Sequence, residues 1–240
     1  MVERGEKKPI LFEILLIIAA FLAAGLFTAV GSVFNMHPSL SSSAGRIFVG
    51  AALLILYRRV LSGGNVFKNF KIVLPAFLFV AWNLYYNLGS GAHFGGVPFY
   101  VEALITAIAP AIFEEVLFRG IFIHNLRKND YSDMKCLWIT TAFFAVAHLT
   151  NLVGLAPLSV AIQLVYSFAI GLVLAAIYLK NGSITQVILV HFLIDFTSGI
   201  YVDAPTSTSW TLIGIFAAFI VAESAYAVWL TSKNRSAGIQ

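Results

Sequence analysis

The chain has 240 residues, of which 60% are hydrophobic and only 11% carry a charge. Soluble domains usually contain about 25% charged residues, so this composition excludes a soluble globular domain and indicates a polytopic membrane protein. The single cysteine, Cys136, excludes an intrachain disulfide and a four-cysteine zinc site.

Apolar segments long enough to cross a bilayer recur along the whole chain. A spanning helix needs about 20 apolar residues, and on this basis we expect one all-α integral membrane domain, residues 1–240, with eight spans. The first segment is too long for a signal-peptide core and lacks a small-residue cleavage site, so we expect it to be retained. The spans are residues 9–34, 40–57, 72–88, 98–123, 136–153, 158–179, 183–200 and 210–230.

The positions of the basic residues predict how the chain is oriented in the membrane. With the N-terminus inside, all 15 Lys and Arg residues except Arg46 and Arg119 fall on the cytoplasmic side, as the positive-inside rule requires. Arg46 lies at the outer end of a span, and Arg119 lies within one. We therefore expect a multi-pass cell-membrane protein with both termini in the cytoplasm. The same rule explains the net charge of +4 without a nucleic-acid partner.

The fourth predicted span contains three charged residues, Glu114, Glu115 and Arg119. Insertion scales put the cost of each charge at the middle of a span at about 2.5–3.5 kcal/mol, so such residues are expected to be paired, solvated or functional. Glu115 and Arg119 are four residues apart, share a helix face and can form an ion pair. Glu114 points about 100° away and is left without this partner.

Two other spans carry polar groups at a similar depth. At 1.5 Å per residue, Glu114, His148 and Asp195 each lie about 18 Å from the inner end of their spans, and His191 lies one turn closer to the cytoplasm. We expect these groups to meet, with access from the cytoplasmic side or laterally from the bilayer. Asp195 is four residues from His191 and could fix the tautomer of its ring, or form only a structural hydrogen bond.

Three short motifs in successive predicted spans resemble those of the CAAX protease and bacteriocin-processing family, also called the Abi family. Its eukaryotic branch is the type II CAAX prenyl endopeptidase. The resemblance covers a core of residues 101–198, and the order of the motifs makes it specific, although each motif alone is weak. The motifs are Glu114-Glu115-x-x-x-Arg119, Phe144-x-x-x-His148 and His191-x-x-x-Asp195.

The resemblance implies hydrolysis of a peptide bond within the membrane, without a covalent intermediate. Glu114 would be the general base that activates a water molecule, and His148 would help to hold that water. Glu115 and Arg119 would orient neighbouring groups and balance charge. His191, together with the residue at position 195, would stabilise the oxyanion.

Position 195 departs from the prenyl endopeptidase branch, which has Asn there. The amide of Asn can donate a hydrogen bond to an oxyanion, whereas an ionised Asp cannot. Asp195 therefore either carries a proton or orients His191. We expect no cofactor: the two Glu and two His residues could hold a divalent metal, but the mechanism implied by the resemblance does not need one.

These patterns predict an intramembrane endopeptidase of bacterial origin. Its substrate would be a membrane-associated peptide or small membrane protein, such as a bacteriocin leader. The alternative is a non-proteolytic immunity or regulatory protein that binds a membrane partner such as a sensor kinase. A small transporter, the third possibility, would depend on the remaining intramembrane acids, Glu13, Glu102 and Glu223.

Overall fold

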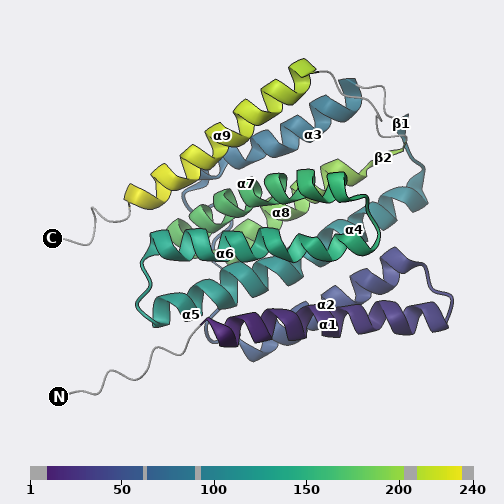
Figure 1. Ribbon diagram of the computed structural model, residues 1–240, viewed down its shortest axis with the longest axis horizontal. Coiled ribbons are helices and arrows are strands. Elements are labelled where there is room, and N and C mark those ends of the chain that lie inside the picture. The colour runs from purple at the N-terminus through teal and green to yellow at the C-terminus, as the bar shows by residue number, and fades with distance from the viewer. Residues whose placement is uncertain (1–9, 62–63, 90–92, 203–209, 234–240) are drawn as a thin grey trace.

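The computed structural model describes residues 10–61, 64–89, 93–202 and 210–233, and helices dominate this part of the chain (Figure 1). The first half contains α1 (Leu11–Val33), α2 (Pro38–Leu56), the short 3-10 helices η1 (Phe70–Ile72) and η2 (Leu74–Ala76), and α3 (Phe77–Gly89). The second half contains α4 (Val97–Glu114), the π-helix η3 (Glu115–Phe122), α5 (Ile123–Lys128), α6 (Asp133–Ala147), the 3-10 helix η4 (His148–Val153), α7 (Pro157–Asn181), α8 (Ile184–Gly199) and α9 (Trp210–Ser232). The all-α class is confirmed.

The strands are short and connect two loops. β1 (His93–Phe94) pairs antiparallel with β2 (Tyr201–Val202), with Phe94 opposite Tyr201. This pairing joins the segment before α4 to the segment after α8. It therefore holds the start of α4 close to the end of α8, and both helices carry predicted site residues.

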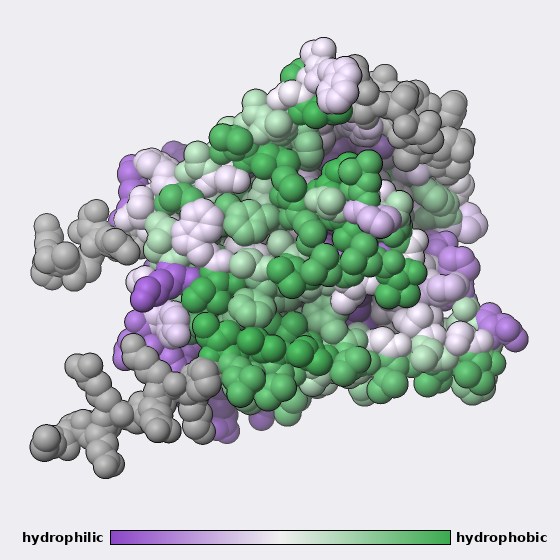
Figure 2. All heavy atoms as spheres, viewed as in Figure 1, coloured by the Kyte–Doolittle hydropathy of each residue, from purple (hydrophilic) through white to green (hydrophobic). Residues whose placement is uncertain are grey.

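The described residues contain five helical segments that are long and apolar enough to cross a membrane, which supports a multi-pass membrane protein. On the face shown in Figure 2, hydrophobic residues fill the middle and most hydrophilic residues lie toward the two ends. α8 is apolar but only 16 residues long, so the count of eight spans stays a prediction. The five segments are Leu11–Val33, Pro38–Leu56, Asp133–Val153, Pro157–Asn181 and Trp210–Ser232.

Several boundaries differ from the predicted spans because the backbone changes its helical form inside an apolar run. The third predicted span begins at residue 72, but α3 starts only at Phe77, since Pro75 confines the preceding residues to short 3-10 turns. The fourth predicted span is one continuous helix that switches to the π form at Glu115. The fifth predicted span leaves the α form at His148, where η4 begins.

Neighbouring helices pack along their length, antiparallel in the α1–α2, α4–α8 and α6–α7 pairs and parallel in the α2–α4 and α7–α9 pairs. α1 packs on α2, α2 on α4, α4 on α8, α6 on α7, and α7 on α9. In Figure 1, α1 and α2 form one side of the bundle, α3 and α9 the other, and the helices with the predicted site residues lie between them. Small residues permit the close approach that membrane helices favour; a Cβ at Gly45 in α2 would collide with the backbone oxygen of Ala24 in α1.

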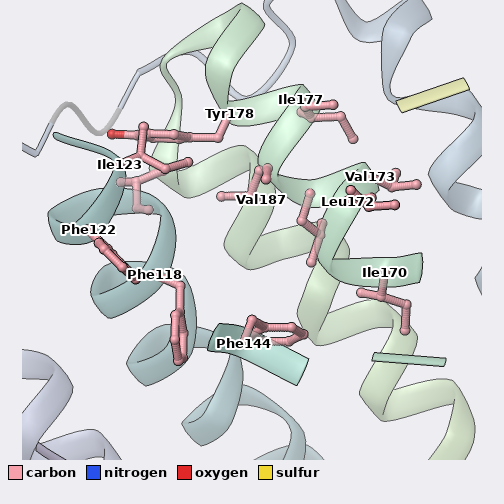
Figure 3. Close-up of a cluster of buried hydrophobic side chains, with 14 of the residues drawn as sticks. Phe118, Phe122, Ile123, Phe144, Ile170, Leu172, Val173, Ile177, Tyr178 and Val187 are labelled. Carbon is pink, nitrogen blue, oxygen red and sulfur yellow. The ribbon is translucent and has the colours of Figure 1, made fainter. Parts of the chain in front are cut away.

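The main buried cluster surrounds η3, α7 and α8. Phe118 and Phe122 of η3, Phe144 of α6 and Val187 of α8 belong to it, along with a run of aliphatic residues in α7 (Figure 3). η3 and α8 also carry predicted site residues. The predicted site residues of η3 and α8 are therefore held by elements of this buried cluster.

The start of α1 and the end of α9 lie at the same end of the bundle (Figure 1). The α5–α6 and α7–α8 connections are also at this end, whereas the α1–α2 and α6–α7 connections are at the other. These connections lie on the same sides of the bundle as the predicted spans place them. The placement of the end with the termini in the cytoplasm remains a prediction.

Candidate active site

The two adjacent glutamates lie where α4 becomes the π-helix η3. Glu114 is the last residue of α4 and Glu115 the first of η3. Pro110, in the preceding turn, lacks the amide hydrogen that would continue the α-helical ladder. Less than 1% of residues in soluble proteins adopt the π form, which is often found at functional sites. Every residue of η3 is buried, so the Glu115 and Arg119 side chains are enclosed by protein.

Glu115 is engaged by two charged or ionisable partners. Its Oε1 accepts a hydrogen bond from Nη1 of Arg119 at 2.6 Å, the ion pair that the spacing predicts. The same oxygen lies 2.7 Å from Nδ1 of His191 in α8. A carboxylate paired with arginine only accepts hydrogen bonds, so Nδ1 of His191 carries the proton in this contact. Glu115 thus fixes the orientation of the His191 ring.

The Arg119 guanidinium makes further contacts with α6 and α7. It lies 4.2 Å from the centre of the Phe144 ring, a cation–π distance, and Nη2 donates to the backbone oxygen of Gly171 at 3.3 Å. Phe144 also contacts the His148 and His191 rings edge to face, at 5.0 and 5.9 Å between ring centres. The Phe144 ring therefore packs against the buried arginine and both histidines.

Gly171 was not identified from the sequence. A Cβ at this position would lie 3.1 Å from a ring carbon of Phe144 and 3.0 Å from Cγ2 of Thr141. Only a residue without a side chain lets α7 come this close to α6 and offer its carbonyl to Arg119. A glycine inside an apolar span was the available signal, but several spans contain one.

Four of the six predicted site residues line a single cavity of about 160 Å³. Glu114 comes from α4, His148 from η4, and His191 and Asp195 from α8. Three segments far apart in sequence thus bring polar groups to one place. A water molecule occupies about 30 Å³ in the liquid, so the cavity has room for water beside these groups. The other two predicted residues, Glu115 and Arg119, support its wall from behind.

The second nitrogen of His191 faces two carboxylates. Nε2 lies 3.4 Å from Oδ2 of Asp195 and 4.0 Å from Oε2 of Glu114. The Asp195 side chain is 33% exposed, against 9% for Glu114. His191 therefore contacts Glu115 through Nδ1, and it faces Asp195 and Glu114 through Nε2.

His148 lies at the junction of α6 and η4. Its Nδ1 is 2.9 Å from the backbone oxygen of Phe144, so Nδ1 is the donor in this contact and Nε2 of the neutral ring is left as an acceptor. An acceptor in a cavity lined by Glu114 could hold a water molecule by one of its hydrogens.

The cavity reaches the surface at the end of the bundle opposite the termini. Its lining includes the exposed Thr150 and the half-buried Asn151 of η4, which follow α6 at the α6–α7 connection (Figure 1). Nδ2 of Asn151 donates to Oε1 of Gln163 in α7 at 2.8 Å. The α-helix ends at Ala147, so His148 lies near the end of its segment that leads into the α6–α7 connection. Access from the cytoplasmic side or laterally from the bilayer stays a prediction, because it depends on the orientation of the chain in the membrane.

The remaining intramembrane acids do not line this cavity. Glu102 accepts a hydrogen bond from Oγ of Ser39 at 2.5 Å and lies 3.3 Å from His37, partners that helical spacing alone could not reveal. Glu13 and Glu223 are buried in α1 and α9. Among the described residues, no group of three or more His, Cys, Asp or Glu side chains is placed to hold a metal ion.

One comparison with known proteins found a family. Residues 96–197 match the family model described as type II CAAX prenyl endopeptidase Rce1-like. The matched segment contains all three motifs and extends from the start of α4 into α8. Comparisons with curated proteins and with solved structures found no match.

Proposed function

We propose that this chain, whose residues 96–197 match the type II CAAX prenyl endopeptidase Rce1-like family model, hydrolyses peptide bonds in the membrane with a water molecule activated by Glu114. The family supports a CAAX-type intramembrane protease as the kind of function. One observation carries the finer assignment: Glu114, His148 and His191 come from separate segments and line one cavity.

Glu114 is the better candidate for the general base because Glu115 is already occupied. The Glu115 side chain is completely buried, and its Oε1 is held by Arg119 and His191. A proton on Glu115 would weaken both contacts. Glu114 lines the cavity, and among the described residues its carboxylate makes no hydrogen bond and has His191, at 4.0 Å, as its ion-pair partner. It can take a proton from water and release it later.

The reaction proceeds in two steps. Glu114 takes a proton from a water molecule that Nε2 of His148 helps to hold, and the water oxygen attacks the carbonyl carbon of the peptide. The tetrahedral intermediate then breaks its carbon–nitrogen bond, and Glu114 returns the proton to the departing amine. The products are a carboxylate and an amine, and no bond to the enzyme forms at any stage.

The negative charge that develops on the carbonyl oxygen needs a donor in the cavity. His191 is suited to this role because Glu115 holds Nδ1 and directs Nε2 toward the cavity carboxylates. A protonated Nε2 would donate to the oxyanion, and a donor preorganised in this way typically contributes about 3–4 kcal/mol. Asp195 lies beside Nε2, where it favours the protonated ring and, when protonated itself, adds a second donor.

The substrate class follows from where the cavity lies. The lining comes from helices of a multi-pass bundle and includes residues of η4 and α2. A peptide that lies in or on the membrane could present its backbone there. We therefore propose a membrane-associated peptide or a small membrane protein as the substrate, without a metal or another cofactor in the chemistry.

The test is a Glu114→Gln variant, purified in detergent and incubated with a mixed library of hydrophobic peptides. We expect wild-type cleavage products, identified by mass spectrometry, to fall about a hundredfold or more in Glu114→Gln, because general-base catalysis contributes at least that much. Glu102→Gln is the matched control: it removes a carboxylate from the same helix but outside the cavity. We expect this control to keep its activity.

Equal cleavage by wild type and Glu114→Gln would rule out the proposed base. If Glu114→Gln instead kept the full biological effect of the chain in cells while no product formed, the non-proteolytic membrane partner would become the better assignment. His148→Ala offers a second check. This variant should also lose activity, because it removes the nitrogen proposed to hold the water molecule.

A further inference from the structure

Arg46 of α2 lines the cavity, although it belongs to none of the three motifs. The sequence places Arg46 at the outer end of a predicted span, whereas most other basic residues of the chain are predicted to lie on the cytoplasmic side. The structure places the side chain, which is half-buried, beside the same space as Glu114 and Asp195. A fourth segment thus contributes a charged group to the cavity.

The guanidinium of Arg46 forms no ion pair with another described residue. Within the part of the chain that the structure describes, its side chain also makes no hydrogen bond. Its charge is close enough to act on Asp195, but Asp195 has His191 as its short contact, at 3.4 Å. Arg119, by contrast, has its charge neutralised by Glu115.

An unpaired guanidinium inside a membrane bundle is costly, so it is expected to face water or to have a functional partner. Arg46 is the only Lys or Arg among the described residues that line the cavity, and the other polar groups near the mouth, Thr150, Asn151 and Gln163, are neutral. Guanidinium binds carboxylates through two parallel hydrogen bonds, and this geometry makes arginine selective for such groups.

We propose that Arg46 is a specificity residue that binds a carboxylate group of the substrate peptide. This inference rests on the proposed peptidase function and adds the chemistry by which a peptide is chosen. The carboxylate could be the C-terminus of the peptide or an Asp side chain, and the two share the same recognition by guanidinium. A peptide whose carboxylate reaches Arg46 in the cavity would be held with its backbone near Glu114.

Binding without turnover tests this inference separately from catalysis. The protein carries Glu114→Gln throughout, and the probe is a fluorescently labelled Phe-Leu-Val-Leu peptide in detergent micelles, followed by fluorescence polarisation. Three forms of the probe are compared: a free C-terminal acid, the C-terminal amide, and an amide in which the third residue is Asp. We expect the acid, the Asp form or both to bind at least tenfold more tightly than the neutral amide.

Arg46→Gln in this background should reduce the preference to less than twofold, and Arg46→Lys should keep part of it. Arg58→Gln is the matched control, because Arg58 is exposed just beyond the inner end of α2 and does not line the cavity. We expect the control to retain the full preference. Which of the two carboxylate probes binds better identifies the source of the carboxylate.

Equal binding of the charged and neutral probes to the parent protein, or no binding of any probe, would overturn the inference without any Arg46 variant. A preference that survives in Arg46→Gln would also overturn it. If Arg46 served only to balance Asp195, its loss would weaken all three probes equally. Glu114-dependent cleavage in the library assay is a separate readout, so failure here leaves the peptidase proposal standing.

Discussion

Arg119 is a cation with 1% of its side chain exposed, and its stability depends on the carboxylate of Glu115. Removing one member of a buried ion pair leaves the other charge uncompensated and typically destabilises by about 3–5 kcal/mol. We therefore expect Arg119→Gln to lower the free energy of unfolding by about this amount, measured by thermal or denaturant unfolding in detergent. The variant should also lose activity, since Glu115 would no longer hold His191 in a defined position.

A double-mutant cycle separates the interaction free energy of the Glu115–Arg119 pair from the contributions of the two individual side chains. Glu115→Gln combined with Arg119→Gln removes both charges, so we expect it to be less destabilised than the sum of the two single variants. Strictly additive effects would show that the two side chains act independently, in conflict with the 2.6 Å contact. The spacing of four residues was enough to predict this pair, because a helix brings such residues onto one face.

The partners of the pair on other helices could not be predicted in the same way. Contacts of Glu115 with His191 and of Arg119 with Phe144 and Gly171 join residues 76, 25 and 52 positions apart in sequence. Helical periodicity fixes which residues of one helix share a face, but it says nothing about which helices become neighbours. For this reason the spacing suggests Asp195, one turn away, as a possible orienting group for His191, but it does not reveal the contact of His191 with Glu115.

At the scale of the elements, the close approach of α6 and α7 depends on Gly171. Gly171→Ala places a Cβ 3.0 Å from Cγ2 of Thr141 and 3.1 Å from a ring carbon of Phe144, so these side chains, or the helices that carry them, must move by a few tenths of an ångström. Overpacking of this kind typically costs about 1–3 kcal/mol. We expect a stability loss in this range by thermal unfolding, together with reduced Glu114-dependent cleavage, because Phe144 packs against Arg119 and both histidines.

Gly214→Ala is the control for that variant. Gly214 lies in α9, and a Cβ there would meet no atom within 4 Å, so the substitution should be neutral or should stabilise by up to about 1 kcal/mol, the helix preference of Ala over Gly. A Gly171→Ala protein as stable as the Gly214→Ala protein would show that α6 and α7 accommodate the methyl group without cost, and would contradict the expected dependence of their packing on Gly171.

The helical form of each element was the least predictable feature of the fold. The apolar runs in the sequence predicted that α1, α2, α7 and α9 exist and roughly where they begin and end, because a spanning helix needs about 20 mostly apolar residues. The π form of η3 and the 3-10 form of η4 have no comparable pattern in sequence. The two forms begin at Glu115 and His148, so they set how Glu114 and His148 are presented.

At the scale of the whole molecule, the orientation in the membrane decides from which side a substrate arrives. The basic residues predict that the end with the α5–α6 connection faces the cytoplasm. The cavity opens near Thr150, at the opposite end. If both are right, the mouth of the site lies on the outer side of the membrane, and peptides reach it from there or laterally from the bilayer.

Cysteine labelling in intact cells tests this arrangement. In a Cys136→Ala background, Thr150→Cys marks the mouth of the cavity and Lys128→Cys marks the end of α5; both positions are exposed. We expect a membrane-impermeant maleimide to label Thr150→Cys in intact cells and Lys128→Cys only after permeabilisation. The reverse pattern would invert the orientation predicted from the basic residues and restore access from the cytoplasm. Equal labelling of both sites in intact cells would contradict the placement of these two connections at opposite ends of a spanning bundle.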